Sequence, residues 1–402
     1  MWRAVRAAPG GIDRLELAMA AHLLREEPGA SLVFTDGGMV RALPEKLARR
    51  LIGDATHRWT GHPDDPGCQR VVTWQAGDDT AFPPALPRWT DRHVSLLDQG
   101  RNLLAGWRYP RRDLPAMDMA GTTYLNLSHR NLDKPALHAA LVSAAHRLCY
   151  IHDDIPLRAP DFTATGGAGP FRRMLEHVGA GGFRIATNSE ASRARLEAAG
   201  IQIGIVVVPP PMADIFLERR DAAPAGRRYF LLPGLLTARK NIRLICAACH
   251  SPRLAPFDIV LAGAPGLDAH ALLASLPALP PGIRMLRAAG LSDHAMRALQ
   301  RGALAVLAPS LEEGFDYPVH EALAAGVPVI ASDIPAHREY VSGHAELLDP
   351  HDQAAWASAL RDYATPGSPR RAAALRAARR FTPAPSRQGL TALLHVARTE
   401  FS

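Results

Sequence analysis

Short apolar runs alternate with stretches of helical periodicity along most of the chain. Runs of four to six apolar residues predict buried strands, and apolar residues spaced three or four apart predict helices between them. This alternation is typical of parallel α/β architecture. In the first half we expect helices over 12–26 and 44–52 and after Pro135 and Ser189, with strands over 31–35, 123–127, 147–152, 183–187 and 205–208.

The second half repeats the same order of strands and helices. Residues 54–115, by contrast, are rich in Pro, Trp and Asp, and they predict an irregular excursion within the first half. Ser292 is the expected N-cap of the helix over 293–301, and Gly326 is expected at the C′ position that ends the helix over 317–325. We expect strands over 229–233, 258–262, 283–286, 303–308, 327–331 and 346–348, and helices over 241–250, 267–275, 293–301 and 317–325 and from residue 353 onward.

Three consecutive prolines, 209–211, separate the two halves. Proline cannot donate to a strand ladder, so this tripeptide predicts a linker. We therefore expect domains over 1–212 and 213–384, and a C-terminal helix over 385–402 that can pack back on the first domain. Doubly wound sheets bind ligands at the carboxyl ends of their strands, so a two-domain version should hold its ligand in the cleft.

Composition narrows the class of protein. The 402 residues are 47% hydrophobic and 21% charged, which suits two packed cores. No apolar run approaches the roughly 20 residues that span a bilayer, and the N-terminus lacks the apolar centre of a secretory signal. These features, with four scattered cysteines, favour a cytoplasmic protein. The net charge of +7 favours anionic partners: phosphates, acidic lipid surfaces or nucleic acid.

The densest chemistry lies between residues 303 and 340. Glu313 precedes a predicted helix and Glu321 lies about one turn inside it, so both carboxylates can face one site, where each could accept hydrogen bonds from the hydroxyls of a sugar. Gly314 allows close backbone approach to a ligand. Asp316 is a plausible N-cap. The alternative is that both glutamates are surface charges at a helix start, where acidic residues are common.

The segment from Glu313 to Glu321, EGFDYPVHE, closely resembles the E-x7-E segment of retaining glycosyltransferases of family 4, which have the GT-B fold. This resemblance implies two Rossmann-like doubly wound parallel-sheet domains facing a central cleft. It also implies that Glu313, Gly314 and Phe315 contact the donor sugar and that Glu321 binds the ribose. The family usually has glycine where this chain has Asp316.

A second segment, residues 229–241, resembles the first strand and loop of the family's donor domain. The resemblance implies that Arg239 and Lys240 clamp the donor diphosphate; Lys240 is one of only three lysines among 46 basic residues. Cations beside a leaving pyrophosphate stabilise its developing charge, so we expect no metal. Many family members have an arginine where this chain has Leu235. Without a ligand, the two cations would be a solvated pair at a helix start.

The first half carries softer motifs. Residues 150–157, YIHDDIPL, resemble a family strand end whose histidine, here His152, faces the donor sugar; taken alone, a histidine there is more often structural. His129 is a weaker match, and residues 187–192 resemble a family helix start. Residues of the first turn resemble the acceptor-side glycine-rich turn: Gly10, Gly11, Ile12 and Arg14. A strand normally precedes that turn, so we hypothesise that Met1 is an internal or misassigned start.

The resemblance implies transfer of a hexose, with retention at the anomeric carbon, from a nucleotide diphosphate sugar to an oligosaccharide or polyprenyl-diphosphate-linked acceptor. The first-half motifs look most like bacterial mannosyl- or rhamnosyltransferases of polysaccharide biosynthesis, which makes GDP-mannose the leading donor. No other cofactor is implied. The alternatives are a nucleotide-sugar 2-epimerase, a non-catalytic sugar-nucleotide binder and a basic nucleic-acid-binding protein, for which no aromatic-interleaved basic patch is found.

Two further patterns have simpler interpretations. Residues 246–250, CAACH, fit the haem-attachment pattern, but a helix between two predicted strands favours buried, inert cysteines. The arginines of residues 369–380 could touch an acidic membrane surface, as a peripheral contact on the inner face of the cytoplasmic membrane, or form a solvated helix face.

Overall fold

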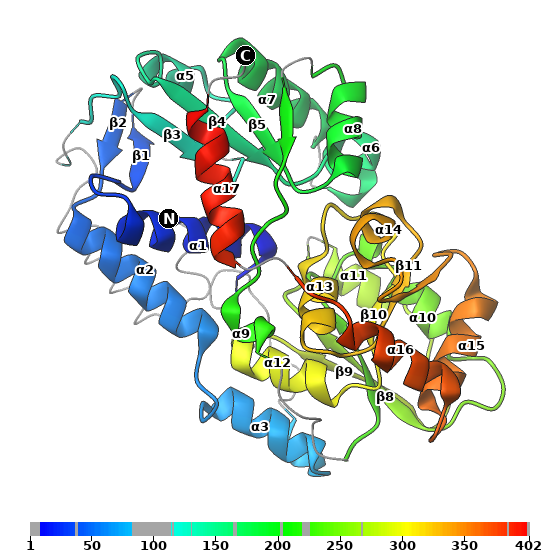
Figure 1. Ribbon diagram of the computed structural model, residues 1–402. Coiled ribbons are helices and arrows are strands. Elements are labelled where there is room, and N and C mark those ends of the chain that lie inside the picture. The colour runs from blue at the N-terminus through cyan, green and yellow to red at the C-terminus, as the bar shows by residue number, and fades with distance from the viewer. Residues whose placement is uncertain are drawn as a thin grey trace. The chain divides into compact units, whose positions relative to one another are not determined.

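The computed structural model divides the chain into two compact units (Figure 1). Unit 1 comprises Met1–His57, Arg92–Pro211 and Ala384–Ser402, and unit 2 comprises Arg58–Asp91 and Met212–Pro383. No helix in the described ranges is both long and apolar enough to cross a membrane. The structure describes residues 9–36, 39–82, 114, 116–129, 131–163, 167–201, 204–218, 226–266, 268–383 and 386–399.

Unit 1 is built on a parallel four-stranded sheet in the order β3-β4-β5-β6. Its strands are β3 (Thr123–Asn126), β4 (His146–Ile151), β5 (Arg184–Thr187) and β6 (Ile205–Val207). Its helices are α1 (Gly11–Glu26), the greater part of α2 (Glu45–Thr60), α5 (Pro135–Ala140), α6 (Ile155–Arg158), α7 (Ala168–Ala180), α8 (Glu190–Ala198) and α17 (Ser386–Arg398), with a 3-10 turn, η4 (Pro160–Phe162).

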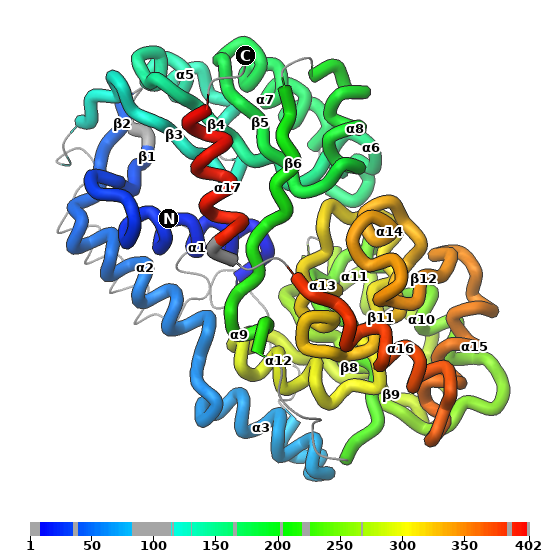
Figure 2. Tube along the Cα trace, in the orientation of Figure 1, coloured from blue at the N-terminus to red at the C-terminus, as the bar shows by residue number. Residues whose placement is uncertain are grey.

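Alternate residues of β4 face opposite sides of this sheet, as the two-residue period of a strand requires. Cys149 and Ile151 pack with apolar residues of α5, α7 and α8. Leu148 and Tyr150 pack with α1 and α17, which contact each other and cross in Figures 1 and 2. The C-terminal helix therefore completes the core of unit 1.

The first predicted strand, 31–35, is not a member of this parallel sheet. β1 (Val33–Asp36) pairs antiparallel with β2 (Met39–Ala42) in a separate two-stranded sheet. The prediction missed β2 because it assigned every strand of the first half to one parallel sheet. An Asp-Gly pair at positions 36 and 37 between two apolar runs is the sequence signal of a hairpin and could have identified it.

Unit 2 contains a parallel six-stranded sheet in the order β12-β11-β10-β7-β8-β9, which confirms the doubly wound prediction. The direction of winding reverses between β7 and β10. The strands are β7 (Tyr229–Pro233), β8 (Phe257–Ala262), β9 (Ile283–Ala288), β10 (Val306–Ala308), β11 (Val329–Ser332) and β12 (Glu346–Leu348). The helices are α9 (Asp214–Leu217), η5 (Ala238–Lys240), α10 (Ile242–Ala248), α11 (Ala269–Ala274), α12 (Asp293–Gly302), α13 (Tyr317–Ala324), α14 (Pro335–Val341), α15 (Gln353–Ala364) and α16 (Pro369–Arg379).

The four central strands of unit 2, β7, β8, β10 and β11, are buried on both faces, which is why they are nearly continuous apolar runs in the sequence. On one face β7 contributes Phe230 and Leu232 to a core shared with α10, α11 and α15. On the other it contributes Tyr229 and Leu231 to a core shared with α9, α12, α13 and α16.

The second core also includes residues that the sequence places in the first half. The predicted boundary of 1–212 is wrong for residues 58–82, because this segment packs in unit 2, and the predicted irregular excursion is wrong for α3 (Pro66–Gln75) and η2 (Asp79–Ala81). Trp74 is fully buried among residues of this core. The Gln75 amide Nε2 donates to the Tyr229 hydroxyl at 2.7 Å and to the Ala298 carbonyl at 2.8 Å.

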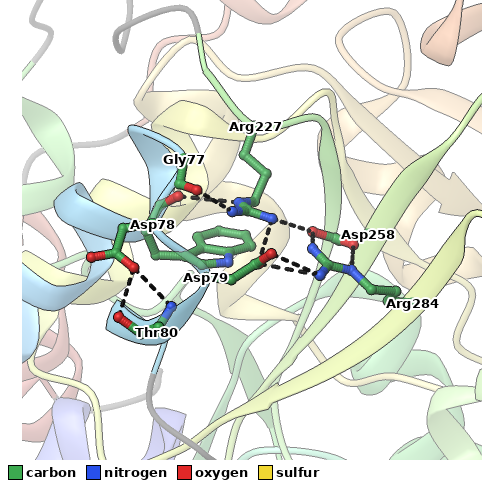
Figure 3. Close-up of polar contacts among 8 residues, drawn as sticks. Gly77, Asp78, Asp79, Thr80, Arg227, Asp258 and Arg284 are labelled. Carbon is green, nitrogen blue, oxygen red and sulfur yellow. Dashed lines mark hydrogen bonds and ion pairs between the residues drawn. The ribbon is translucent and has the colours of Figure 1, made fainter.

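A network of charges anchors the same segment beside the start of β7 (Figure 3). The Arg227 guanidinium pairs with Asp79 at 2.7 Å, donates to the Gly77 carbonyl at 3.0 Å and lies 5.0 Å from the centre of a Trp74 ring. Arg284 on β9 donates to both oxygens of Asp258, at 2.7 and 2.8 Å. Residues 58–82 are therefore an integral part of unit 2.

Candidate functional site

Two loops meet where the winding of the unit 2 sheet reverses. The first follows β7 and contains Arg239 and Lys240, and the second follows β10 and contains Glu313 and Asp316. The Leu311 amide donates to the Arg239 carbonyl at 2.9 Å, and Arg239 Nη1 donates to the Glu312 carbonyl. Open parallel sheets bind ligands at this switch point, beyond the carboxyl ends of the strands.

Lys240 lies between the two carboxylates of the second loop. Its Nζ is 2.9 Å from Glu313 Oε1 and 2.9 Å from Asp316 Oδ1, and the residue is only 4% exposed. Arg239 also pairs with Glu313. Gly234, with φ of +115°, leaves room for this lysine, since a Cβ there would lie 3.0 Å from Lys240 Cε. The structure thus brings Arg239 and Lys240, predicted from one motif, together with Glu313, predicted from another.

Asp316 is at the N-cap position of α13, but its side chain does not cap that helix. Instead, Oδ1 accepts from Lys240, and Oδ2 lies 3.2 Å from His337 Nε2 on α14. The predicted capping role is therefore wrong, because Lys240 and His337 contact the two carboxylate oxygens instead. The residue has φ of +59°, a left-handed conformation that glycine adopts freely and aspartate tolerates better than most residues.

The charges in this cluster stabilise one another. Burial alone would raise the pKa of Glu313, but Arg239 and Lys240 hold it below its ordinary value. Burial would likewise raise the pKa of Asp316, and Lys240 and His337 together lower it. Burial would lower the pKa of Lys240, but the two carboxylates raise it. All three groups are therefore charged at neutral pH.

The other predicted donor residues lie on the same loop or helix. Gly314 and Phe315 are buried, and the Phe315 ring stacks on His320 with centroids 3.8 Å apart. Burial lowers the pKa of His320 to about 4, so this ring is neutral at pH 7. Glu321 is buried on α13, one turn beyond the cluster. The proposed contacts of Phe315 and Glu321 with a donor stay predictions.

The predicted residues of the first half lie in unit 1. His152 follows β4, and its Nε2 lies 2.7 Å from the Leu127 carbonyl. Its backbone N–H donates to Nε2 of His129 at 2.8 Å. The geometry matches the simpler, structural interpretation of this histidine, and its contact with a sugar stays a prediction.

The glycine-rich turn predicted to face the acceptor begins α1 in unit 1. Gly10 is its N-cap, and the Gly10 amide donates to Asp13 at 2.8 Å. Gly11, Ile12 and Arg14 lie in the first turn of this helix. Their contact with an acceptor stays a prediction. Residues 1–8, on which the hypothesis about Met1 depends, lie outside the described residues.

Sequence reasoning missed several polar groups at this edge of unit 2. His337 lies on the helix after β11, and no spacing pattern connects it with Asp316, 21 residues earlier. Three hydroxyl oxygens also lie here, buried and without a hydrogen-bond partner in the described part of the chain: those of Thr237, Ser310 and Ser332. Buried polar atoms are nearly always satisfied, so water or a ligand is the expected partner.

Other expectations can also be compared with the structure. Cys246 and Cys249 are buried in the core of unit 2, which confirms their interpretation as small hydrophobes; burial raises the pKa of these thiols to about 11 and 12. On α16, Arg370 pairs with Glu346 and Asp362, so this part of the basic stretch binds within the protein. Within the described ranges, no group of three or more His, Cys, Asp or Glu residues could hold a metal ion.

Comparison with known proteins relates part of the chain to a family. Residues 227–365 match the family model described as "Glycosyl transferases group 1". The O-antigen chain mannosyltransferase RfbU of Salmonella typhimurium is 38% identical to this chain over 71 residues. That alignment covers 18% of this chain and 20% of RfbU.

Two solved structures are similar to this chain in fold. The alpha,alpha-trehalose-phosphate synthase (UDP-forming) of Burkholderia xenovorans, in complex with glucose-6-phosphate, has a TM-score of 0.52 and 12% identity, covering 92% of this chain and 89% of that chain. Anabaena HepE in complex with UDP-glucose has a TM-score of 0.51 and 16% identity, covering 75% and 83%. The chain has the GT-B fold, and the part of unit 2 over residues 227–365 matches the family of group 1 glycosyl transferases.

Proposed function

We propose that the protein is a glycosyltransferase that moves a hexose from a nucleotide diphosphate sugar to an oligosaccharide or lipid-linked acceptor, with retention at the anomeric carbon. One observation carries the proposal: Arg239, Lys240 and Glu313 meet at the switch point of a sheet within a group 1 domain. Two cations and a carboxylate are the groups needed to hold a diphosphate and a sugar hydroxyl.

In this proposal the residues of unit 2 act on the donor. Arg239 and Lys240 stabilise the charge that develops on the diphosphate as the glycosidic bond breaks. Glu313 positions the sugar, together with the backbone at Gly314 and Phe315, and Glu321 holds the ribose. The leaving phosphate takes the acceptor's proton in a front-face attack, a mechanism that needs no metal ion. In unit 1, His152 faces the sugar, and the turn at residues 10–14 contacts the acceptor.

Mannose is the proposed sugar and GDP-mannose the proposed donor. The first-half motifs resemble mannosyl- and rhamnosyltransferases of polysaccharide assembly, and the RfbU alignment supports the same class. Anabaena HepE was solved with UDP-glucose, which makes UDP-sugars the main competitors. We place the enzyme in the cytoplasm, at the inner face of the membrane that carries its acceptor.

A donor panel tests this proposal. Thermal shifts with GDP-mannose, UDP-glucose and dTDP-rhamnose should identify the donor, because a bound ligand stabilises only the native state. Glu321→Ala should reduce donor affinity about tenfold through the loss of hydrogen bonds to the ribose. Glu176→Ala, at an exposed position on α7, is the matched control and should leave affinity unchanged. Absence of a shift with every nucleotide sugar would refute the proposal.

The reaction assay separates the enzymatic alternatives. A transferase releases nucleoside diphosphate only when acceptor is present, and the release should persist in EDTA. A 2-epimerase of the same fold would convert the donor without acceptor. A non-catalytic binder would show donor affinity and no turnover.

A further inference from the structure

The Asp316 side chain has a role that the proposed donor contacts do not explain. It is 7% exposed, in a backbone conformation that costs aspartate more than glycine, and both of its oxygens contact cationic groups. A carboxylate this close to a phosphate-binding lysine would repel a diphosphate. Its presence in the cluster therefore requires a physical account.

His337 offsets the negative charge of Asp316. Its Nδ1 lies 2.8 Å from the Ser332 carbonyl oxygen, and its Nε2 lies 3.2 Å from Asp316 Oδ2. A carbonyl and a carboxylate are both acceptors, and a ring that donates to both of them carries a hydrogen on each nitrogen, as an imidazolium does. The residue is completely buried, and a buried cation of this kind needs its counter-ion.

The cluster as a whole has more positive than negative groups. The cluster holds three cations and two carboxylates: Arg239, Lys240 and His337 against Glu313 and Asp316. Each carboxylate contacts two cations. With three positive and two negative groups, the cluster carries a net charge of about +1. His320, whose ring contacts the Asp316 carbonyl at 3.2 Å, is neutral and does not change this balance.

We propose that Asp316 and His337 form a buried ion pair that holds Lys240 in position and determines how strongly its ammonium group attracts the donor diphosphate. Asp316 is thus a positioning residue, and His337 is the counter-charge that keeps it from repelling the donor. The inference rests on the proposed function, since it assigns the diphosphate to this site. It applies to pyrophosphate as well as to complete donors.

Neutral substitutions of the two residues should change anion affinity in opposite directions. Asp316→Asn removes a negative charge beside Lys240 and should raise the affinity for pyrophosphate and for GDP about tenfold in calorimetric titration. His337→Gln removes the balancing positive charge and should lower both affinities about tenfold. The double variant should return close to wild type.

Structural damage would weaken binding in both single variants, so opposite signs identify the electrostatic role. Asp316→Gly is the second variant where Asp316→Asn does not fold, because glycine fits the left-handed conformation. The matched control is the exposed pair of His62 and Asp64, 3.3 Å apart in the same unit. Asp64→Asn and His62→Gln should change neither affinity.

A urea-unfolding cycle makes the inference independent of any ligand. Each single variant leaves a buried charge without its partner. The double variant should therefore lose less free energy of unfolding than the sum of the two single losses. Additive losses, or affinities that fall in both single variants, would overturn the inference. A wild-type protein that binds neither pyrophosphate nor any nucleoside diphosphate would instead refute the proposed function, and the unfolding cycle would still decide on the ion pair.

Discussion

The two parallel sheets of this protein end in different kinds of polar contact. At the carboxyl edge of the unit 1 sheet, His152 contacts the Leu127 carbonyl and the Asn188 amide donates to the His152 carbonyl at 2.5 Å, while the buried Asp154 pairs with two partly exposed arginines, Arg158 and Arg195. At the corresponding edge of unit 2, Lys240, Glu313 and Asp316 form ion pairs with one another. Side chain–backbone bonds fix a loop, whereas the unit 2 cluster also includes the partly exposed Arg239, whose charge is available to an anionic ligand.

The units also complete their cores differently. Unit 1 uses its own C-terminal helix, α17, whereas unit 2 takes α3 from the first half of the chain. Four experiments test these differences between the units.

Lys240→Met should have the largest effect. It leaves two buried carboxylates without their shared cation, which should cost about 3–5 kcal/mol in the free energy of unfolding. Turnover with the donor should fall at least a hundredfold. The control is Lys134→Met in unit 1, whose ion pair with Asp133 is exposed and should contribute less than about 1 kcal/mol. Equal losses in urea unfolding of the two variants would contradict the comparison.

Trp74→Ala tests where α3 belongs. The fully buried indole fills the core of unit 2, so its removal should cost about 3–5 kcal/mol. Hydrogen exchange should locate the loss of protection in β7 and α12. Val72→Ala, on the same helix and 40% exposed, should cost well under about 1 kcal/mol. A loss of protection confined to unit 1 would show that the assignment of α3 is incorrect.

Acid should destabilise unit 2 through its carboxylates. The folded pKa values of Glu313 and Asp316 lie below their ordinary values of 4.5 and 3.8, so the unfolded chain binds more protons as the pH falls. Their contribution to stability is complete at neutral pH and is lost below about pH 4.5. Thermal unfolding from pH 7 to pH 3 should show this decline, and the double variant Glu313→Gln/Asp316→Asn should show a shallower one.

His152→Ala should have the smallest effect of the four. It leaves the Leu127 carbonyl without its side-chain partner, at a cost of about 1–3 kcal/mol in unit 1. If the proposed contact with the sugar is correct, affinity for the nucleotide sugar falls while affinity for the nucleoside diphosphate does not change. His57→Ala, at an exposed position, is the control. A loss of nucleoside diphosphate affinity would contradict the assigned role of His152.

Local patterns predicted most of the elements and the residues of the central cluster. Ser189 and Ser292 are N-caps as expected, and each accepts from the backbone amide three residues later. Lys240 and Glu313 were predicted from two motifs 73 residues apart, because each motif has a fixed place in a strand–loop–helix unit. Short sequence segments are therefore enough to predict which charged residues lie at the end of a strand.

Long-range partners could not be predicted in this way. Asp316 looked like a helix cap because the cap signal is local, whereas its contacts with Lys240 and His337 depend on how three loops converge. Trp74 lies in a segment rich in loop-forming residues, and its burial depends on a sheet formed about 150 residues later. Periodicity carries no information about such partners.

The bond between Gln75 and Tyr229, 154 residues apart in sequence, has a consequence for synthesis of the chain on the ribosome. Elongation at about 5–20 residues per second separates the translation of the two residues by roughly 10–30 s. Throughout that interval the nascent α3 exposes an indole with no sheet to cover it. Chaperones that hold apolar segments are most useful to this protein in that interval, and a gene fragment beginning after the three prolines would encode a unit that never receives its missing helix.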